Sequence, residues 1–208
     1  MLILASASPR RQELLRNAGI PFIVEPTDIP EVPHPDEAPK DFVERLACEK
    51  ARVIAQNHLD DFVLGADTAV VVEDEILNKP ADRADATRML RLLSGRTHQV
   101  MTGVCVIAPG KQLRTQNREP GTELVRSEKT AVTFEKLSKE EIDFYVSTGE
   151  PMDKAGAYGI QGIASRWISR IEGDYFNVVG LPVALVYRMM RELAFQAIEK
   201  ISPSFRSG

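Results

Sequence analysis

Apolar positions along the chain recur with two different spacings, and segments of the two kinds follow one another in a mixed order. In residues 40–56, "KDFVERLACEKARVIAQ", apolar side chains recur at intervals of three and four, which predicts an amphipathic helix. Long apolar stretches in residues 97–109 and 123–135 predict two strands joined by a polar loop around residues 110–121. Helices and strands in this order predict an α/β fold with a mixed central sheet flanked by helices.

The same patterns place the remaining elements. Strands are predicted at residues 2–5, 21–25 and 61–77, and helices at residues 9–18, 82–94, 139–148 and 181–200. Residues 61–77 are expected to form two strands, because the small polar insert Gly65–Thr68 interrupts an otherwise apolar run. Residues 26–39 are rich in proline and are expected to be irregular. Ser138 and Glu141 have the spacing of a capping box.

The first predicted helix has an unusual opening turn. Ser8 fits the N-cap, Pro9 fits the first helical position, and Gly19 fits the end of the helix. Arg10 and Arg11 then fall in the first turn, where free N–H groups and the helix dipole favour acidic side chains. Local rules are broken in this way at functional sites, and a multiply charged anion bound at this turn would resolve the conflict.

Composition and charge narrow the classes of protein that fit. The 208 residues have 43% hydrophobic content, and no linker, repeat or low-complexity tract interrupts them, so we expect a single domain over residues 1–208. The formal net charge of -4 argues against nucleic acid or a membrane surface as a partner. No apolar run approaches the roughly 20 residues that span a bilayer, and we expect no signal segment.

Cysteine and histidine usage bears on the compartment and on metal motifs. Cys48 and Cys105 lie in expected core elements and indicate reduced thiols, so we expect a cytoplasmic protein. His34, His58 and His98 are scattered and do not have the spacing of a zinc motif.

Three charged residues stand out against apolar surroundings. Lys50 occupies the apolar face of the helix over residues 40–56, so it either extends past the rim of the core or reaches a phosphate or carboxylate in a cleft. Asp67 projects from between apolar strands, where burial raises the pKa of a carboxyl group; the alternative is an aspartate that forms an Asx-turn. Lys79 precedes a proline and fits a solvated loop.

Residues 153–162, "DKAGAYGIQG", are rich in glycine. Their glycine spacing differs from the dinucleotide-binding fingerprint G-x-G-x-x-G, and no strand precedes them. We expect them to shape a pocket wall, the alternative being a simple glycine-rich turn. Gln161 offers both a donor and an acceptor, as recognition of a base edge requires. The sequence lacks the motifs of P-loop NTPases, zinc proteases and serine hydrolases.

Together these candidates combine cations with carboxylates. The cations are Arg10, Arg11, Lys50 and Lys79, and the carboxylates are Asp28, Glu31 and Asp67. Cations suit a polyphosphate, and one or two carboxylates together with phosphate oxygens are the coordination that Mg²⁺ favours. The sequence therefore predicts a site for a polyphosphate and a divalent metal.

Several blocks in a fixed order carry a family resemblance. They are "LASASPRRQELL", "EKA", "GADTAVV", "LNKP", "MLRLLSGRTHQVMTGV", "EPMDKAGAYGIQG" and "NVVGLP". On these blocks the chain resembles, over nearly its whole length, the Maf family of septum-formation-inhibitor-like nucleoside triphosphate pyrophosphatases. Arg10, Thr68 and Gln161 make it most similar to the branch that hydrolyses dTTP and UTP.

The resemblance implies hydrolysis of dTTP and UTP, or of modified pyrimidine nucleotides, to the monophosphate and pyrophosphate, with Mg²⁺ or Mn²⁺. It implies a deep central cleft like that of the inosine triphosphate pyrophosphatases, and a homodimer. Asp67 would be the proton acceptor or a metal ligand, with Glu31 near the metal. The phosphates would be held by Ser8, Arg11, Lys50 and Lys79, and base preference would be set by Arg10, Thr68 and Gln161.

Two other classes of function remain open. A nucleotide-sensing or septum-associated regulator would bind nucleotide without turnover, although a pure binder has less need of a carboxylate facing a polyanion. A nucleic-acid-binding protein would show strongly salt-dependent association, which the acidic net charge disfavours.

Overall fold

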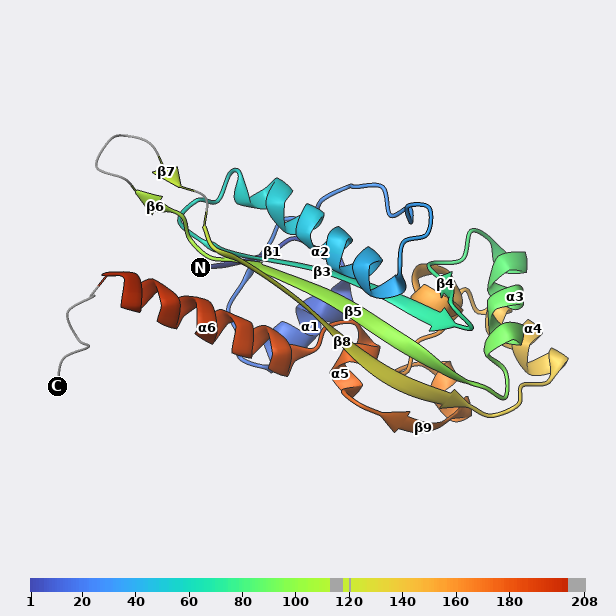
Figure 1. Ribbon diagram of the computed structural model, residues 1–208. Helices are drawn as coiled ribbons and strands as arrows, with labels where there is room; N and C mark the ends of the chain where they lie inside the picture. The colour runs from blue at the N-terminus through green and yellow to red at the C-terminus, as the bar shows by residue number, and fades with distance from the viewer. Residues whose placement is uncertain (113–117, 120, 202–208) are drawn as a thin grey trace.

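The computed structural model describes residues 1–112, 118–119 and 121–201, and within them seven strands form one mixed sheet (Figure 1). The order across the sheet is β2-β1-β3-β5-β8-β9, and β4 pairs with β3. The strands are β1 (Leu2–Leu4), β2 (Ile23–Val24), β3 (Phe62–Val72), β4 (Glu75–Leu77), β5 (Thr97–Ile107), β8 (Glu123–Phe134) and β9 (Ile168–Glu172). Strand β1 is parallel to β2 and β3, and the other pairs are antiparallel, which confirms the predicted mixed sheet.

Helices cover both faces of this sheet. Helix α2 (Pro39–Ala55) packs on one face, whereas α1, α5 and α6 lie on the other (Figure 1). The remaining bounds are α1 (Pro9–Asn17), α3 (Arg83–Leu93), α4 (Lys139–Ser147), α5 (Tyr175–Val179) and α6 (Val183–Ile201). The predicted α/β class is confirmed. Within the described residues no helix combines the length and apolar character needed to cross a membrane.

The helix ends follow the signals in the sequence. Ser8 caps α1, because its Oγ accepts a hydrogen bond from the backbone N–H of Arg11, and Pro9 occupies the first turn. Ser138 and Glu141 form the predicted capping box of α4. The first turn of α1 carries no acidic residue, so its two arginines have no local counter-charge.

Strand β3 runs without interruption through Gly65–Thr68, so the predicted break there is wrong. A Cβ atom at Gly65 would overlap the carbonyl oxygen of Ala47 on α2. The glycine thus marks a place where the helix lies directly on the strand, and not a bend. The chain reverses instead at Glu73 and Asp74, whose φ angles of 49° and 67° form the turn into β4.

The two edges of β3 are paired differently. Towards β5 the strand is paired from Val63 to Val71, but on the other edge β1 reaches only Leu64 and β4 begins only at Val70. Among the described strands, none covers that edge over residues 65–69. Residues in this gap alternate between the two faces of the sheet. Ala66 and Ala69 are fully buried, whereas Asp67 and Thr68 line a cavity.

Between α4 and α6 the chain forms short elements that the sequence pattern does not predict. They are the 3-10 turns η1 (Glu150–Asp153), η2 (Ala155–Ala157) and η3 (Ile163–Trp167), followed by β9 and α5. Elements of three to five residues are too short to show a hydrophobic period.

The predicted polar loop around residues 110–121 contains a short antiparallel pair, β6 (Lys111–Gln112) and β7 (Arg118–Glu119). Residues 113–117 and 120 of that loop lie outside the described residues, as do residues 202–208. The single domain over residues 1–208 therefore stays a prediction.

Candidate active site

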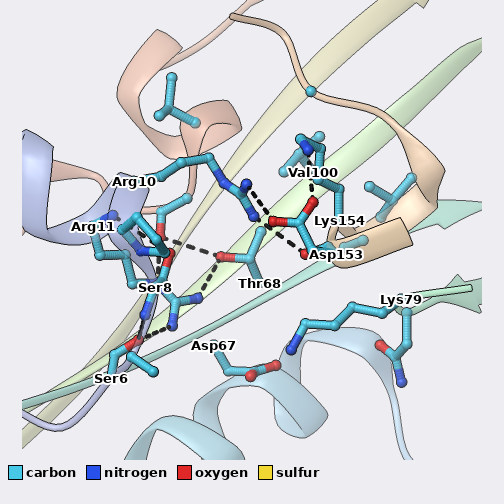
Figure 2. Close-up of a pocket in the computed structure, with 18 of the residues that line it drawn as sticks. Ser6, Ser8, Arg10, Arg11, Asp67, Thr68, Lys79, Val100, Asp153 and Lys154 are labelled. Carbon is cyan, nitrogen blue, oxygen red and sulfur yellow. Dashed lines mark hydrogen bonds and ion pairs between the residues drawn. The ribbon is translucent and has the colours of Figure 1, made fainter. Parts of the chain in front are cut away.

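A cavity of about 990 Å³ opens at the uncovered edge of β3 (Figure 2). Every predicted site residue lines it: Ser8, Arg10, Arg11, Glu31, Lys50, Asp67, Thr68, Lys79 and Gln161. Asp28 lines it as well. These residues come from the start of α1, the proline-rich segment, α2, β3, the chain after β4 and the glycine-rich segment. The fold therefore brings together side chains that are far apart in the sequence.

The centre of the cavity holds a buried cation between two carboxylates. Nζ of Lys50 lies 2.6 Å from Oδ1 of Asp67 and 2.6 Å from Oε1 of Glu31. Lys50 and Asp67 are each 6% exposed. Lys50 thus reaches carboxylates in a cleft, and the alternative in which it extends past the rim of the core is wrong. The Asx-turn alternative for Asp67 is also wrong, since Asp67 lies within a continuous strand.

The pKa values of the two carboxyl groups, Asp67 and Glu31, shift in opposite directions. Burial raises the pKa of Asp67 above its ordinary value, although the charges of Lys50 and Arg11 oppose the rise. Partial burial acts in the same sense on Glu31, but there Lys50, Lys79 and Arg11 outweigh it and lower the pKa. Burial therefore prevails at Asp67, whereas the neighbouring cations prevail at Glu31.

Arg11 lies beneath the cavity and ties several segments together. Its Nε donates to the Gly180 carbonyl oxygen at 2.9 Å, and Nη1 donates to Ser6 Oγ at 3.1 Å and to the Ala66 carbonyl oxygen at 2.8 Å. Its Nη2 donates to Thr68 Oγ1 at 3.0 Å. The Ala66 oxygen belongs to the uncovered edge of β3, so the guanidinium replaces a missing strand there. Arg11 thus holds the cavity in shape as well as contributing positive charge to it.

Arg10 extends across the cavity and meets residues that the sequence analysis did not single out (Figure 2). Its Nη1 donates to Asp153 Oδ2 at 3.0 Å, and Asp153 Oδ1 also accepts from Nζ of Lys154 at 2.6 Å. Both residues line the cavity. In the sequence, Asp153 and Lys154 are visible only as the adjacent charged pair that opens the glycine-rich segment "DKAGAYGIQG".

The glycine-rich segment is a shaped wall, as predicted. Glu150 accepts hydrogen bonds from the Tyr145 hydroxyl at 3.0 Å and from the backbone N–H of Ile163 at 3.2 Å. A Cβ atom at Gly162 would overlap the Glu150 carboxylate, so a larger residue there would displace that side chain. Gln161 is exposed in this wall and lines the cavity.

The other predicted phosphate ligands lie at the rim. Ser8 sits at the N-terminus of α1, where backbone N–H groups point towards an incoming anion. Nζ of Lys79 lies 3.7 Å from Oε2 of Glu31, and its side chain is 60% exposed. Lys79 is therefore a solvated loop lysine that also faces the cavity.

A mixed α/β fold with a cleft that gathers cations, carboxylates and a helix N-terminus is typical of metal-dependent enzymes acting on phosphate compounds. The chain belongs to the Maf family, since the family model described as "Maf-like protein" matches residues 1–193. The family resemblance found in the sequence is thereby confirmed.

Relatives named "dTTP/UTP pyrophosphatase" match most of the chain. One from Koribacter versatilis is 58% identical over 91% of this chain and 93% of its own, and one from Symbiobacterium thermophilum is 52% identical over 93% and 94%. One from Bacillus anthracis is 48% identical over 92% and 93%. Among solved structures, the Staphylococcus aureus Ham1 protein matches with a TM-score of 0.46 and 15% identity, covering 80% of this chain and 79% of that one.

Proposed function

We propose that this chain is a nucleoside triphosphate pyrophosphatase that hydrolyses dTTP and UTP to the monophosphate and pyrophosphate. The observation that carries the proposal is the convergence of Lys50, Asp67 and Glu31 in one cavity that is also bordered by a helix N-terminus and further cations. The names of relatives up to 58% identical support the same reaction and the same bases. Modified pyrimidine nucleotides fit the same chemistry.

Glu31 and Asp67 fit a divalent metal, because their oxygens already converge on a single point that a cation, the Lys50 ammonium, occupies. We propose that they hold Mg²⁺ or Mn²⁺ together with phosphate oxygens, the donor set that Mg²⁺ favours. The ion, when bound, neutralises charge on the phosphate oxygens.

The triphosphate tail is assigned to four residues around this centre: Ser8, Arg11, Lys50 and Lys79. Water attacks the α-phosphorus while pyrophosphate leaves in line, so negative charge accumulates on the bridging and terminal oxygens. Fixed cations and the N–H groups at the start of α1 stabilise that charge, and such electrostatic stabilisation usually contributes more to catalysis than any other effect.

Asp67 has the protonation behaviour of a base for this step. Its raised pKa makes it a better proton acceptor than an ordinary aspartate, and it lies beside the cations that hold the phosphates. It accepts the proton of the attacking water, or it ligates the metal, and the two roles differ in how turnover depends on metal concentration.

Base preference is assigned to Arg10, Thr68 and Gln161. Gln161 can pair with the O4 and N3–H edge that thymine and uracil share, since its amide offers an acceptor and a donor side by side. Thr68 accepts from Arg11 and shares a hydrogen bond of 2.9 Å with Thr102, so its position is fixed from both sides.

A cytoplasmic location, a homodimer, and the lack of a nucleic-acid or membrane partner stay predictions. They rest on cysteine usage, on the family resemblance and on the acidic net charge of -4.

The direct test is a panel of canonical and modified triphosphates assayed for released phosphate species with Mg²⁺ and with Mn²⁺. The expected result is pyrophosphate and monophosphate in equal amounts, with dTTP and UTP as the preferred substrates. Release of orthophosphate would contradict the proposed reaction. Tight nucleotide binding without any product would support a regulator that binds but does not hydrolyse.

A further inference from the structure

A second cluster of reactive side chains lies outside the cleft, on the face of the sheet that α2 covers. Cys48 of α2 is 7% exposed and Cys105 of β5 is fully buried, and both are free thiols. Glu123, at the start of β8, completes the cluster. The two sulfur atoms and a carboxylate oxygen of Glu123 all lie within 4.8 Å of one another.

The close approach of α2 to the sheet brings these residues together. Gly65 is the cross-strand partner of Cys105, and a Cβ atom at Gly65 would overlap the carbonyl oxygen of Ala47, the residue before Cys48. Ile107 lies two residues after Cys105 on β5 and on the same face of the sheet. On the other side of β5, Ile107 pairs with Glu123 of β8, so Glu123 shares that face. The backbone thus fixes all three donors from three different elements.

The negative charge for a divalent cation comes from Glu123 and from the two thiols once they ionise. Arg52, one turn after Cys48 on α2, donates to both carboxylate oxygens of Glu123, at 2.7 and 2.8 Å, and keeps the carboxylate in place. Two thiolates and this carboxylate, together with Arg52 and a divalent ion, make an electrically neutral set.

We propose that Cys48, Cys105 and Glu123 form a binding site for a thiol-seeking divalent cation of the zinc or cadmium type. Thiolate ligands select such soft or borderline ions over Mg²⁺, which prefers oxygen. Both thiols release their protons to solvent as the ion binds. The fourth tetrahedral position takes a water molecule from an adjacent cavity of about 400 Å³, which Arg52 and Glu123 line.

Cadmium titration of the reduced, metal-free protein tests the site without any nucleotide. One equivalent of Cd²⁺ is expected to produce an ultraviolet thiolate-to-cadmium charge-transfer band, and Zn²⁺ is expected to remove it by competition. Carboxylates give no such band, so the Asp67→Asn variant, altered only in the cleft, is expected to keep it in full. This test can therefore fail while the proposed pyrophosphatase activity stands.

Substitutions identify the ligands. Cys48→Ser and Cys105→Ser are expected to lose the one-equivalent band, and Glu123→Gln is expected to keep a band with affinity weakened by about tenfold or more. Thermal unfolding of each metal-free variant shows whether it is folded, and Cys48→Ala provides a second test at that position. The proposal is overturned by the absence of a band in fully reduced wild type, or by an undiminished band in either serine variant.

Discussion

Nζ of Lys50 lies 2.6 Å from Oδ1 of Asp67, and each side chain is 8% exposed. The pair joins α2 to β3 at the place where Gly65 lets the helix lie on the strand. Asp67 is two residues after Gly65 and shares its face of the strand, and Lys50 is one turn beyond Ala47 on the helix. The close packing of α2 on β3 therefore places the Lys50 ammonium beside the Asp67 carboxylate.

Asp67→Asn is expected to lower the turnover of dTTP by about 10²-fold or more, the scale of a lost general base. The fold should survive, because Lys50 keeps Glu31 as its partner. Pyrophosphate release measured over a range of Mg²⁺ concentrations separates the two candidate roles. A lost base lowers kcat at every metal concentration, whereas a lost ligand shifts the metal dependence. Undiminished activity would refute the catalytic assignment.

Lys50→Met is expected to destabilise the protein by about 3 kcal/mol, because it leaves the Asp67 carboxyl group buried without its ammonium partner. Arg11 supplies part of the missing charge and keeps the effect near the lower end of the range. Chemical denaturation measures the free energy of unfolding. Adding Asp67→Asn to this variant should restore part of the stability, and additive losses in the double variant would show that the two residues are not coupled.

Arg10, Arg11 and Lys50 could be predicted because each of them broke a local rule, whereas Thr68 was assigned only through the family resemblance. Two arginines opened a helix without acidic neighbours, and Lys50 replaced an apolar residue in the middle of a helix face. Such violations are visible in the sequence since they need only local comparison. The sequence does not show that these side chains meet in one cavity. That depends on where α2 packs against β3 and on the uncovered edge of β3.

The errors have the same origin. Gly65 looked like a break, and only its packing against Ala47 shows that it permits close contact instead. Asp153 and Lys154 are the two charged residues of the glycine-rich segment, and neither was predicted as a site residue, because the contact of Asp153 in the cavity is with Arg10, 143 residues away in the chain. The short elements between α4 and α6 are held by tertiary hydrogen bonds, such as that from Ile163 to Glu150, which leave no periodic pattern.

Asp153→Asn is expected to lower the KM for dTTP several-fold, because it removes negative charge from a cavity that takes a polyanion and releases Arg10 and Lys154. Stability should change by less than about 1 kcal/mol, since the Asp153 side chain is 63% exposed. Asp143→Asn is a matched control, as Asp143 pairs with Lys139 on the surface of α4 outside the cleft. Equal effects of the two substitutions on KM would contradict a role for Asp153 in the cleft.

Stability should fall as the pH drops from 6.5 towards 4 through the charging of His98. Burial lowers the pKa of His98 from 6.5 to about 4, and its Nε2 shares a hydrogen bond of 2.8 Å with the Tyr158 hydroxyl. The folded state thus disfavours the charged ring, so the contribution is complete above pH 6.5 and shrinks below it, by about 3 kcal/mol in all. His98→Gln should lack this component. A difference in unfolding free energy between the two proteins that stays constant from pH 7 to pH 4 would contradict the assignment.

Gln161→Ala is expected to reduce discrimination between UTP and CTP. With UTP, the kcat should change less than the KM. The reason is that Gln161 lines the cavity but takes no part in the Lys50–Asp67 contact, so its loss should alter contact with a base edge rather than that pair. The ratio of kcat/KM for the two nucleotides measures the effect. Gln56→Ala, an exposed glutamine at the end of α2 and outside the cleft, is the matched control and should keep the wild-type ratio. If Gln161→Ala also keeps that ratio, the base preference comes from other residues of the cavity.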